Sequence, residues 1–208
     1  MEAFVGLYWT YPVNWAGFRQ LSVDVDAAAA QSRTIRYQRE LIRRWVADEA
    51  GHLVDEVTFM DSSPDRPTDA IYEAVSRVQP ICVAHNARLV IARFGRWRQH
   101  HFLHHRLGEM RIDFVDLDPQ PMTIDGVRFE PIEHFRHWAS AGEAASAARR
   151  RDAIAALRKA GREIGPDPGR YEKIAHLLNQ TGVKTFTGKA WTGENVKKAL
   201  LMPEVVGE

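Results

Sequence analysis

The sequence has few of the features that mark secreted or membrane proteins. Cys82 is the only cysteine among 208 residues, so a disulfide framework is excluded. It lies in the apolar run 81–84 (ICVA), which predicts a small buried side chain. No signal-peptide pattern and no run of about eighteen apolar residues occurs. We therefore expect a cytoplasmic protein that does not span a membrane.

The formal net charge is only +1, but the charge is unevenly divided along the chain. Residues 141–208 contain 12 Lys and Arg against 8 Asp and Glu, a net +4, while residues 1–140 carry a net −3. An acidic body with a basic tail is typical of a protein whose tail contacts an anionic partner. A chance division of solvent-exposed charges gives the same numbers, so this pattern alone leaves both interpretations open.

Strand-like and helical patterns alternate over the first 117 residues. Short apolar runs indicate buried strands, and apolar residues at helical spacing indicate the helices between them. The predicted strands are 3–8, 53–60, 80–84, 87–92 and 112–117, and the predicted helices are 27–50, 68–78 and 99–110. This alternation predicts an α/β fold with a parallel sheet in a three-layer arrangement.

A different pattern begins at residue 123. Residues 123–129 predict a β-hairpin with Asp125 and Gly126 in its turn. Residues 131–162 predict one long helix with a strongly basic end, and the sequence GPDPG that follows predicts a linker. We therefore predict three parts, which are an α/β domain (1–130), a long linking helix (131–164) and a small C-terminal helical domain (165–208).

Residues 170–202 have the pattern of two helices separated by a polar loop. An apolar stripe runs along the first helix, Gly182 ends it, and Thr192 is the predicted N-cap of the second helix. Such a helix-turn-helix-like domain can dock on the phosphate backbone of double-stranded DNA. The residues predicted to contact DNA are Lys184, Thr187, Lys189, Asn195, Lys197 and Lys198, together with Arg149, Arg150, Arg158, Lys159 and Arg162 of the long helix.

Five segments along the chain contain recognisable motifs. They are Gln31-Ser32 with residues 37–42 (YQRELI), Asp65-Arg66-Pro67, residues 89–97 (LVIARFGRW), the long helix with its basic end, and residues 174–201. In this order they resemble the serine recombinases of the resolvase–invertase type over almost the whole chain. The last segment is the most specific, because it keeps the residue types and spacing found in larger members of the family. The resemblance implies a resolvase-like domain, a homodimer or higher homo-oligomer formed through the long helix, and no cofactor.

The chemistry of this family requires a serine hydroxyl that attacks a DNA phosphate and arginines that stabilise the anionic transition state. In the family the serine follows the first strand, within Tyr-x-Arg-x-Ser. The matching segment here is LYWTY, so Trp9 takes the arginine position and Tyr11 takes the serine position. Shifting the alignment by one residue places Thr10 and Pro12 there instead. The resemblance therefore implies a degenerate member whose catalytic site is not intact.

The second arginine cluster of the family is also incomplete. Residues 95–99 (GRWRQ) keep only Arg96 of the family pattern Asp-Arg-x-x-Arg, and Arg66 keeps its place after the second strand. Two retained arginines can bind a phosphate, but without the nucleophile they cannot form the covalent intermediate. Tyr11 as a replacement nucleophile is the enzymatic alternative, and it requires a base or arginines placed for its longer reach.

Two other residue groups have both a functional and a structural interpretation. The histidines of residues 100–105 form i, i+4 pairs that can bind a metal, but neither acidic residues nor cysteines accompany them. We predict an exposed helix face there and no metal site. The aromatic residues of 9–18 can stack on bases or pack against the sheet edge, and we predict packing.

The sequence thus favours a sequence-specific DNA-binding protein that derives from a serine recombinase and has lost strand exchange. We expect it to act as a transcriptional regulator, or as an accessory factor of a mobile element or phage, in the cytoplasm and associated with the nucleoid. Two alternatives remain open. One is an active site-specific recombinase with an atypical nucleophile, and the other is a protein-interaction module that no longer binds DNA.

Overall fold

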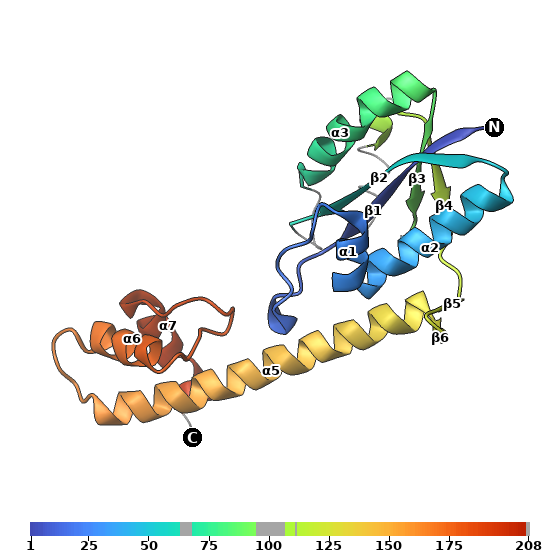
Figure 1. Cartoon of the computed structure of the whole chain (residues 1–208). Helices are drawn as coiled ribbons and strands as arrows, with labels where there is room; N and C mark the ends of the chain where they lie inside the picture. The colour runs from blue at the N-terminus through green and yellow to red at the C-terminus, as the bar shows by residue number, and fades with distance from the viewer. Residues whose placement is uncertain (63–67, 95–106, 111, 207–208) are drawn as a thin grey trace. The chain divides into compact units, whose positions relative to one another are not determined.

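The computed structural model of the chain describes residues 1–62, 68–94, 107–110 and 112–206 (Figure 1). The chain forms two compact units, Met1–Arg136 and His137–Glu208. The division falls inside the long helix α5 (Pro131–Glu163), whereas the sequence places boundaries at 130 and 164. The first turn of α5 therefore belongs to the first unit, and the remainder forms part of the second.

The first unit is built on a four-stranded parallel sheet. The strand order is β2 (His52–Met60), β1 (Ala3–Thr10), β3 (Arg88–Ala92) and β4 (Phe114–Leu117). The central strands are strongly apolar, as expected for strands that are covered on both faces, and Leu89, Val90 and Ile91 are fully buried. Helix α3 (Ala70–His85) covers one face and α2 (Arg33–Asp48) the other (Figure 1). The predicted α/β fold with a parallel sheet is therefore confirmed.

The predicted strand at 80–84 is wrong, because these residues belong to α3. Pro80 lies inside this helix, where it lacks the backbone N–H and costs about 3 kcal/mol in a typical helix. The helix continues through it because the buried side chains all fall on one face. They are Ile71, Ala74, Val75, Val78 and Cys82. Burying each large apolar side chain contributes about 1.5–3 kcal/mol, which offsets the cost of the proline.

The predicted single helix 27–50 is two helices with a break at Ser32. Helix α1 spans Val25–Gln31, and α2 begins at Arg33. Ser32 has an extended backbone, with φ −133° and ψ 117°, and its hydroxyl accepts a hydrogen bond of 3.3 Å from the backbone N–H of Ile35. Ser32 therefore ends α1 and caps α2.

A short hairpin precedes α5, as predicted. Strand β5 (Met122–Ile124) pairs antiparallel with β6 (Val127–Phe129). Asp125 and Gly126 form the turn with φ angles of 52° and 75°, which suit a two-residue hairpin loop.

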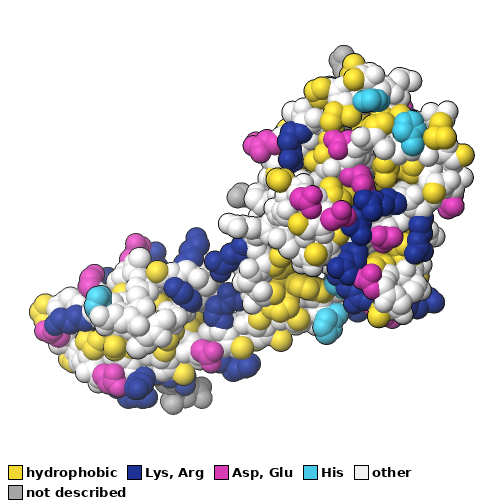
Figure 2. Space-filling view, viewed as in Figure 1, with side chains coloured by type: hydrophobic (Ala, Val, Ile, Leu, Met, Phe, Trp, Pro, Cys, Tyr) yellow, Lys and Arg dark blue, Asp and Glu magenta, His cyan; other side chains and the backbone are white. Residues whose placement is uncertain are grey.

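The second unit is helical. Helices α6 (Arg170–Gln180), α7 (Gly193–Leu200) and α8 (Pro203–Val206) follow α5, whose side chains Ala153 and Leu157 are fully buried in the core of this unit. Lys and Arg side chains lie at several places over this unit in the view of Figure 2. Within the described ranges, no helix of either unit is long and apolar enough to cross a membrane.

Candidate nucleic-acid interface

The two positions that the resemblance assigns to catalysis lie at the carboxyl end of β1. Trp9, at the arginine position, is only 4% exposed, and its indole N–H donates a hydrogen bond of 3.3 Å to the carbonyl of Ala92 at the end of β3. Tyr11, at the serine position, is half-buried, and its ring stands edge-on to that of Trp9 at 5.4 Å. Trp9 is thus a packed core residue, as predicted for the aromatic residues of 9–18, whereas Trp15 of the same segment is 42% exposed and does not follow that prediction.

Further aromatic rings fill the space around Trp9. Phe94 lies 5.7 Å from Trp9, 5.0 Å from Phe135 and 5.9 Å from Tyr37, measured between ring centroids. Burial raises the pKa of Tyr37 to about 12, although the hydrogen bond that the Tyr37 oxygen accepts from the backbone N–H of Gln120 acts in the opposite direction. A neutral cluster of aromatic rings therefore surrounds the position that the resemblance assigns to a catalytic arginine.

The structure describes only some of the other residues that the sequence analysis considers for catalysis or metal binding. Arg66, Arg96 and the histidines of 100–105 lie outside the described residues. The serine hydroxyls near the sheet serve the local backbone, because Ser22 accepts a hydrogen bond of 3.1 Å from the N–H of Asp24 and Ser32 caps α2. Among the residues that the structure describes, no group of three His, Cys, Asp or Glu side chains could hold a metal ion.

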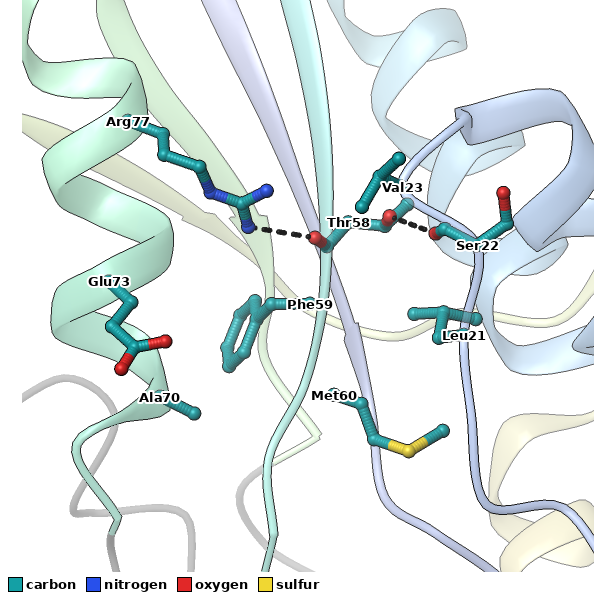
Figure 3. Close-up of a pocket in the computed structure, with 9 residues that line it drawn as sticks. All are labelled: Leu21, Ser22, Val23, Thr58, Phe59, Met60, Ala70, Glu73 and Arg77. Atoms are coloured by element: carbon teal, nitrogen blue, oxygen red, sulfur yellow. Dashed lines mark hydrogen bonds between the residues drawn. The ribbon is translucent and has the colours of Figure 1, made fainter.

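An open cavity of about 460 Å³ lies at the outer edge of β2 (Figure 3). Arg77 of α3 donates a hydrogen bond of 3.3 Å to the carbonyl of Thr58, and the Thr58 hydroxyl donates one of 2.8 Å to the carbonyl of Ser22. The guanidinium of Arg77 and the hydroxyl and carbonyl of Thr58 are therefore engaged in hydrogen bonds within the protein. The other lining residues are Leu21, Val23, Phe59, Met60, Ala70 and Glu73.

A half-buried polar cluster lies between β1, β2 and α2. The Tyr8 hydroxyl donates to Glu56, and the guanidinium of Arg43 donates to both carboxylate oxygens of Glu56 at 2.9 and 2.7 Å. Burial, and then the charge of Glu56, raise the pKa of Tyr8 far above its ordinary value. Burial alone would raise the pKa of Glu56, but the hydrogen bonds from Arg43 and Tyr8 outweigh it and lower that pKa. This cluster holds its charges in pairs and stabilises the fold.

The core of the second unit is organised around Trp191. This residue is 4% exposed, and its ring stands edge-on to that of Phe186 at 5.8 Å. The side-chain amide of Asn179 binds both backbone groups of Trp191, accepting from its N–H at 2.8 Å and donating to its carbonyl at 2.9 Å. Trp191 therefore fixes the loop before α7 to helix α6.

Residues 181–192 connect α6 to α7 by a hydrogen-bonded loop. Thr185 donates from its N–H to the carbonyl of Lys189 at 2.9 Å, and its hydroxyl accepts from the Lys189 N–H at 2.9 Å. Gly188 donates to the carbonyl of Thr185 at 2.8 Å and has a φ of 82°. A helix-turn-helix has a turn of about three or four residues, so this connection is longer than the predicted motif.

Helix α7 begins with a capping box. The Thr192 hydroxyl accepts from the N–H of Asn195 at 3.3 Å, and the Asn195 side chain accepts from the N–H of Thr192 at 2.9 Å. The predicted N-cap at Thr192 is therefore confirmed. Asn195, which the sequence assigns to DNA contact, uses its side-chain oxygen within the protein.

The other predicted DNA-contact residues fall into two groups. The first is exposed on the 181–192 loop, on α7 and at the end of α5. It consists of Lys184, Thr187, Lys189, Lys197 and Arg162. The second group is engaged in contacts of the unit itself. Lys198 pairs with Glu194 at 2.7 Å, and Lys159 approaches Glu163 at 3.9 Å. Arg149 lies against the loop, where its guanidinium would be 2.9 Å from a Cβ placed on Gly188.

Arg150 and Arg158 contact helix α8, which the sequence did not predict. Arg150 pairs with Glu204 at 2.5 Å and stacks over Phe186, 4.8 Å from the ring centre. Arg158 donates to the backbone carbonyls of Glu204 and Val205 at 2.7 and 3.1 Å. Four residues near a chain end give too short a pattern for helical periodicity, so only the apolar pair Val205-Val206 after Pro203 indicated a packed segment.

Comparisons with known proteins assign the C-terminal part of the chain. Residues 151–208 match the family model described as Recombinase. The match covers the end of α5 and all of α6, α7 and α8, so this region is recombinase-like and the resemblance predicted from the sequence is confirmed there. No curated protein and no solved structure matches the chain.

Proposed function

We propose that this protein binds double-stranded DNA in a sequence-specific manner through its second unit and no longer catalyses strand exchange. The observation that carries the proposal is a contrast between two regions. The recombinase-like region keeps an exposed basic loop and helix, whereas the arginine position at the end of β1 holds the buried Trp9.

The proposed DNA surface consists of the 181–192 loop and the outer face of α7. Val196 and Ala199 of α7 face the core, which leaves Lys197 and Lys198 on the exposed side. Lysines on such a surface bind phosphates and release condensed counterions, which supplies affinity without sequence preference. The sequence preference would come from α7 and from the Thr187 hydroxyl, which can reach base edges or phosphates.

The loss of catalysis follows from the chemistry of phosphoryl transfer. The transition state needs cationic groups around the phosphate, and Trp9 supplies none. The loss of a nucleophile typically lowers the rate by several orders of magnitude. A protein that keeps the DNA contacts without the chemistry would serve as a transcriptional regulator, or as an accessory factor of a mobile element or phage.

We further propose that the protein forms a homodimer, or a higher homo-oligomer, through α5. All residues of the α5 stretch 137–152 are described, and not one of their side chains is buried. This stretch contains Ala139, Ala141, Gly142, Ala144 and Ala145, and such small residues allow helices to approach closely. A two-fold dimer would place two DNA-binding units on paired half-sites. Sedimentation of the full chain at several concentrations measures this directly, and a mass that stays monomeric would contradict the dimer.

The test of the proposed function is DNA-site selection with the purified full chain, followed by incubation with the selected duplex under conditions that trap covalent adducts. We expect selection of a defined site and no DNA–protein adduct. An adduct that disappears in the Tyr11→Phe variant would instead support a recombinase with a tyrosine nucleophile.

Salt dependence separates DNA binding from the protein-interaction alternative. DNA binding through phosphates weakens steeply as the salt concentration rises. The triple variant in which Lys184, Lys189 and Lys197 are changed to Ala should lose most of its DNA affinity. A matched triple variant, with Arg19, Arg44 and Arg128 of the first unit changed to Ala, serves as the control. If the chain binds no duplex even at low salt, the DNA-binding proposal is wrong.

A further inference from the structure

Helix α8 occupies two arginines that belong to the basic end of α5. Both the Nε and the Nη2 of Arg150 donate to one carboxylate oxygen of Glu204, at 3.0 and 2.5 Å. Arg158 uses the same two atoms to bind the carbonyls of Val205 and Glu204, at 3.1 and 2.7 Å. The same short segment therefore satisfies the donor edges of two guanidinium groups.

These contacts have the geometry with which arginine binds a phosphate. A guanidinium presents a planar fork of N–H donors, and carboxylates and phosphates both accept two of its hydrogen bonds. Glu204 therefore takes the place of a phosphate oxygen at Arg150. A DNA phosphate cannot use the same donor edge while Glu204 remains there.

The attachment of α8 is small enough to be reversible. The helix has only four residues, which is too few for stability on its own. The side chains of Arg150 and Glu204 are 42% and 52% exposed, so solvent and salt screen their attraction. Val205 is the buried anchor at 3% exposure, whereas Leu201 before the helix is 75% exposed.

Arg150 has a second support that does not depend on α8. Its guanidinium stacks over Phe186, 4.8 Å from the ring centre, and Phe186 packs on Trp191 in the core. If α8 moved away, this stacking would keep Arg150 close to its present position. The released donor edge would therefore be ready for an anion.

We propose that α8 is a displaceable cover that masks Arg150 and Arg158 from DNA phosphates and so lowers the DNA affinity of the second unit. This inference rests on the proposed DNA-binding function and extends the DNA surface to two arginines of α5, of which Arg150 stacks on Phe186 of the 181–192 loop. DNA binding and α8 docking exclude each other at these two arginines. A partner or a modification that removes α8 would increase DNA affinity.

The experiment is a titration of the full chain and three variants with a mixed-sequence DNA duplex. Glu204→Gln removes the competing carboxylate, and Val205→Ala loosens the buried anchor without changing any charge. Asp167→Asn is the control, because it also removes one carboxylate from a surface ion pair of this unit, with Lys173 on α6, which is not part of the proposed DNA surface. We expect about three- to tenfold tighter binding for the first two variants, since the cover would then be open most of the time.

A second readout follows α8 itself. Amide hydrogen exchange at residues 204–206 should become faster when the duplex is added to the wild-type chain, because DNA displaces the helix. Amide exchange that slows or stays constant on DNA binding would contradict the proposal that α8 is a displaceable cover.

The outcomes distinguish the two proposals. If the wild type binds DNA and Glu204→Gln and Val205→Ala bind no more tightly, the cover is wrong and the DNA-binding function stands. If Glu204→Gln and Asp167→Asn tighten binding equally while Val205→Ala does not, only net charge matters and the proposed cover is again wrong. If neither the wild type nor any variant binds the duplex, both proposals are overturned.

Discussion

The side-chain amide of Gln38 forms hydrogen bonds with both the backbone N–H and the backbone carbonyl of Trp9. Its Oε1 accepts a hydrogen bond from the N–H of Trp9 at 3.1 Å, and its Nε2 donates to the carbonyl of Trp9 at 2.7 Å. The same Nε2 also donates to the carbonyl of Thr34 at 3.2 Å, and Gln38 is completely buried. The residue at the arginine position of the family is therefore fixed through its main chain as well as through its ring.

This relationship predicts a large effect of changing Gln38. The Gln38→Leu variant leaves the two backbone groups of Trp9 buried without partners, and each such group costs about 1–3 kcal/mol. We expect the free energy of unfolding to fall by about 2–4 kcal/mol, measured by urea denaturation with tryptophan fluorescence. Gln20→Ala, at an exposed position of the same unit, should leave it nearly unchanged. Equal transitions for Gln38→Leu and the wild type would contradict this account.

Placing the arginine and serine of the resembled motif at positions 9 and 11 should not produce catalysis. Trp9→Arg places a guanidinium in a position that is 4% exposed and surrounded by aromatic rings. A buried charge without a partner is strongly unfavourable, so we expect a loss of about 4 kcal/mol or more in the free energy of unfolding. Trp9→Phe should lose less, because it keeps an aromatic ring in the cluster. Thermal denaturation of the two variants measures the difference, and a stable Trp9→Arg variant that cleaves DNA together with Tyr11→Ser would contradict the prediction.

Apolar spacing predicted most of the sheet, because parallel strands such as Leu89–Ala92 are buried on both faces and contain continuous apolar runs. It failed where a local residue preference and tertiary burial disagreed. The sequence predicts that the helix ends before Pro80, yet the buried face of α3 carries the helix past it. Ser32 breaks a continuous apolar pattern because its hydroxyl caps the next helix.

The basic residues of the candidate interface could be predicted from the sequence, but the ion pairs that some of them form within the unit could not. Basic residues of α5 and α7 are visible in the sequence, and Thr192 is recognisable as a cap. Which arginines are free, however, depends on contacts between residues far apart in the chain. Arg150 and Glu204 are 54 residues apart in the sequence and are brought together by the packing of the helices between them, so no local pattern indicates that pair.

The half-buried cluster of Tyr8, Arg43 and Glu56 makes the stability of the first unit depend on pH. The folded protein lowers the pKa of Glu56 from its ordinary value of 4.5. A carboxyl group with a lowered pKa stabilises the fold above its ordinary pKa, and this contribution is lost as the pH falls through the lowered value. Glu56→Gln should therefore be less stable than the wild type near neutral pH, and the difference should shrink as the pH falls below about 4.5.

The control for this prediction is Glu194→Gln in the second unit. The pKa of Glu194 is also lowered, by its hydrogen bond to Lys198, but this carboxylate is fully exposed and solvent screens the pair. Its stability curve should follow that of the wild type at every pH. A constant gap between Glu56→Gln and the wild type from neutral to acidic pH would show that the charge of Glu56 is not involved.

Asn195 and Lys197 should differ in what they contribute to the second unit. Asn195→Ala breaks the capping box of α7, so it should lower the free energy of unfolding by about 1 kcal/mol. Lys197→Ala should change stability by less than about 0.5 kcal/mol, but it should weaken DNA binding and reduce the salt slope by about one. Urea denaturation and DNA titration at several salt concentrations measure both quantities. If Asn195→Ala weakens DNA binding beyond its effect on stability, Asn195 contacts DNA as the sequence predicts.

Two glycines of the second unit provide a matched test of the position of Arg149. Gly182 and Gly188 have φ angles of 74° and 82°, so an alanine at either position costs about 1–2 kcal/mol of backbone strain. A Cβ at Gly182 meets nothing within 4 Å, whereas one at Gly188 lies 2.9 Å from the guanidinium of Arg149. The flexible end of Arg149 can move away, so both alanine variants should lose similar stability. Only Gly188→Ala should also weaken binding to a DNA duplex, by about threefold, because it displaces a guanidinium from the proposed surface. Equal DNA affinities of the two variants would show that Arg149 does not contribute to DNA binding from its present position.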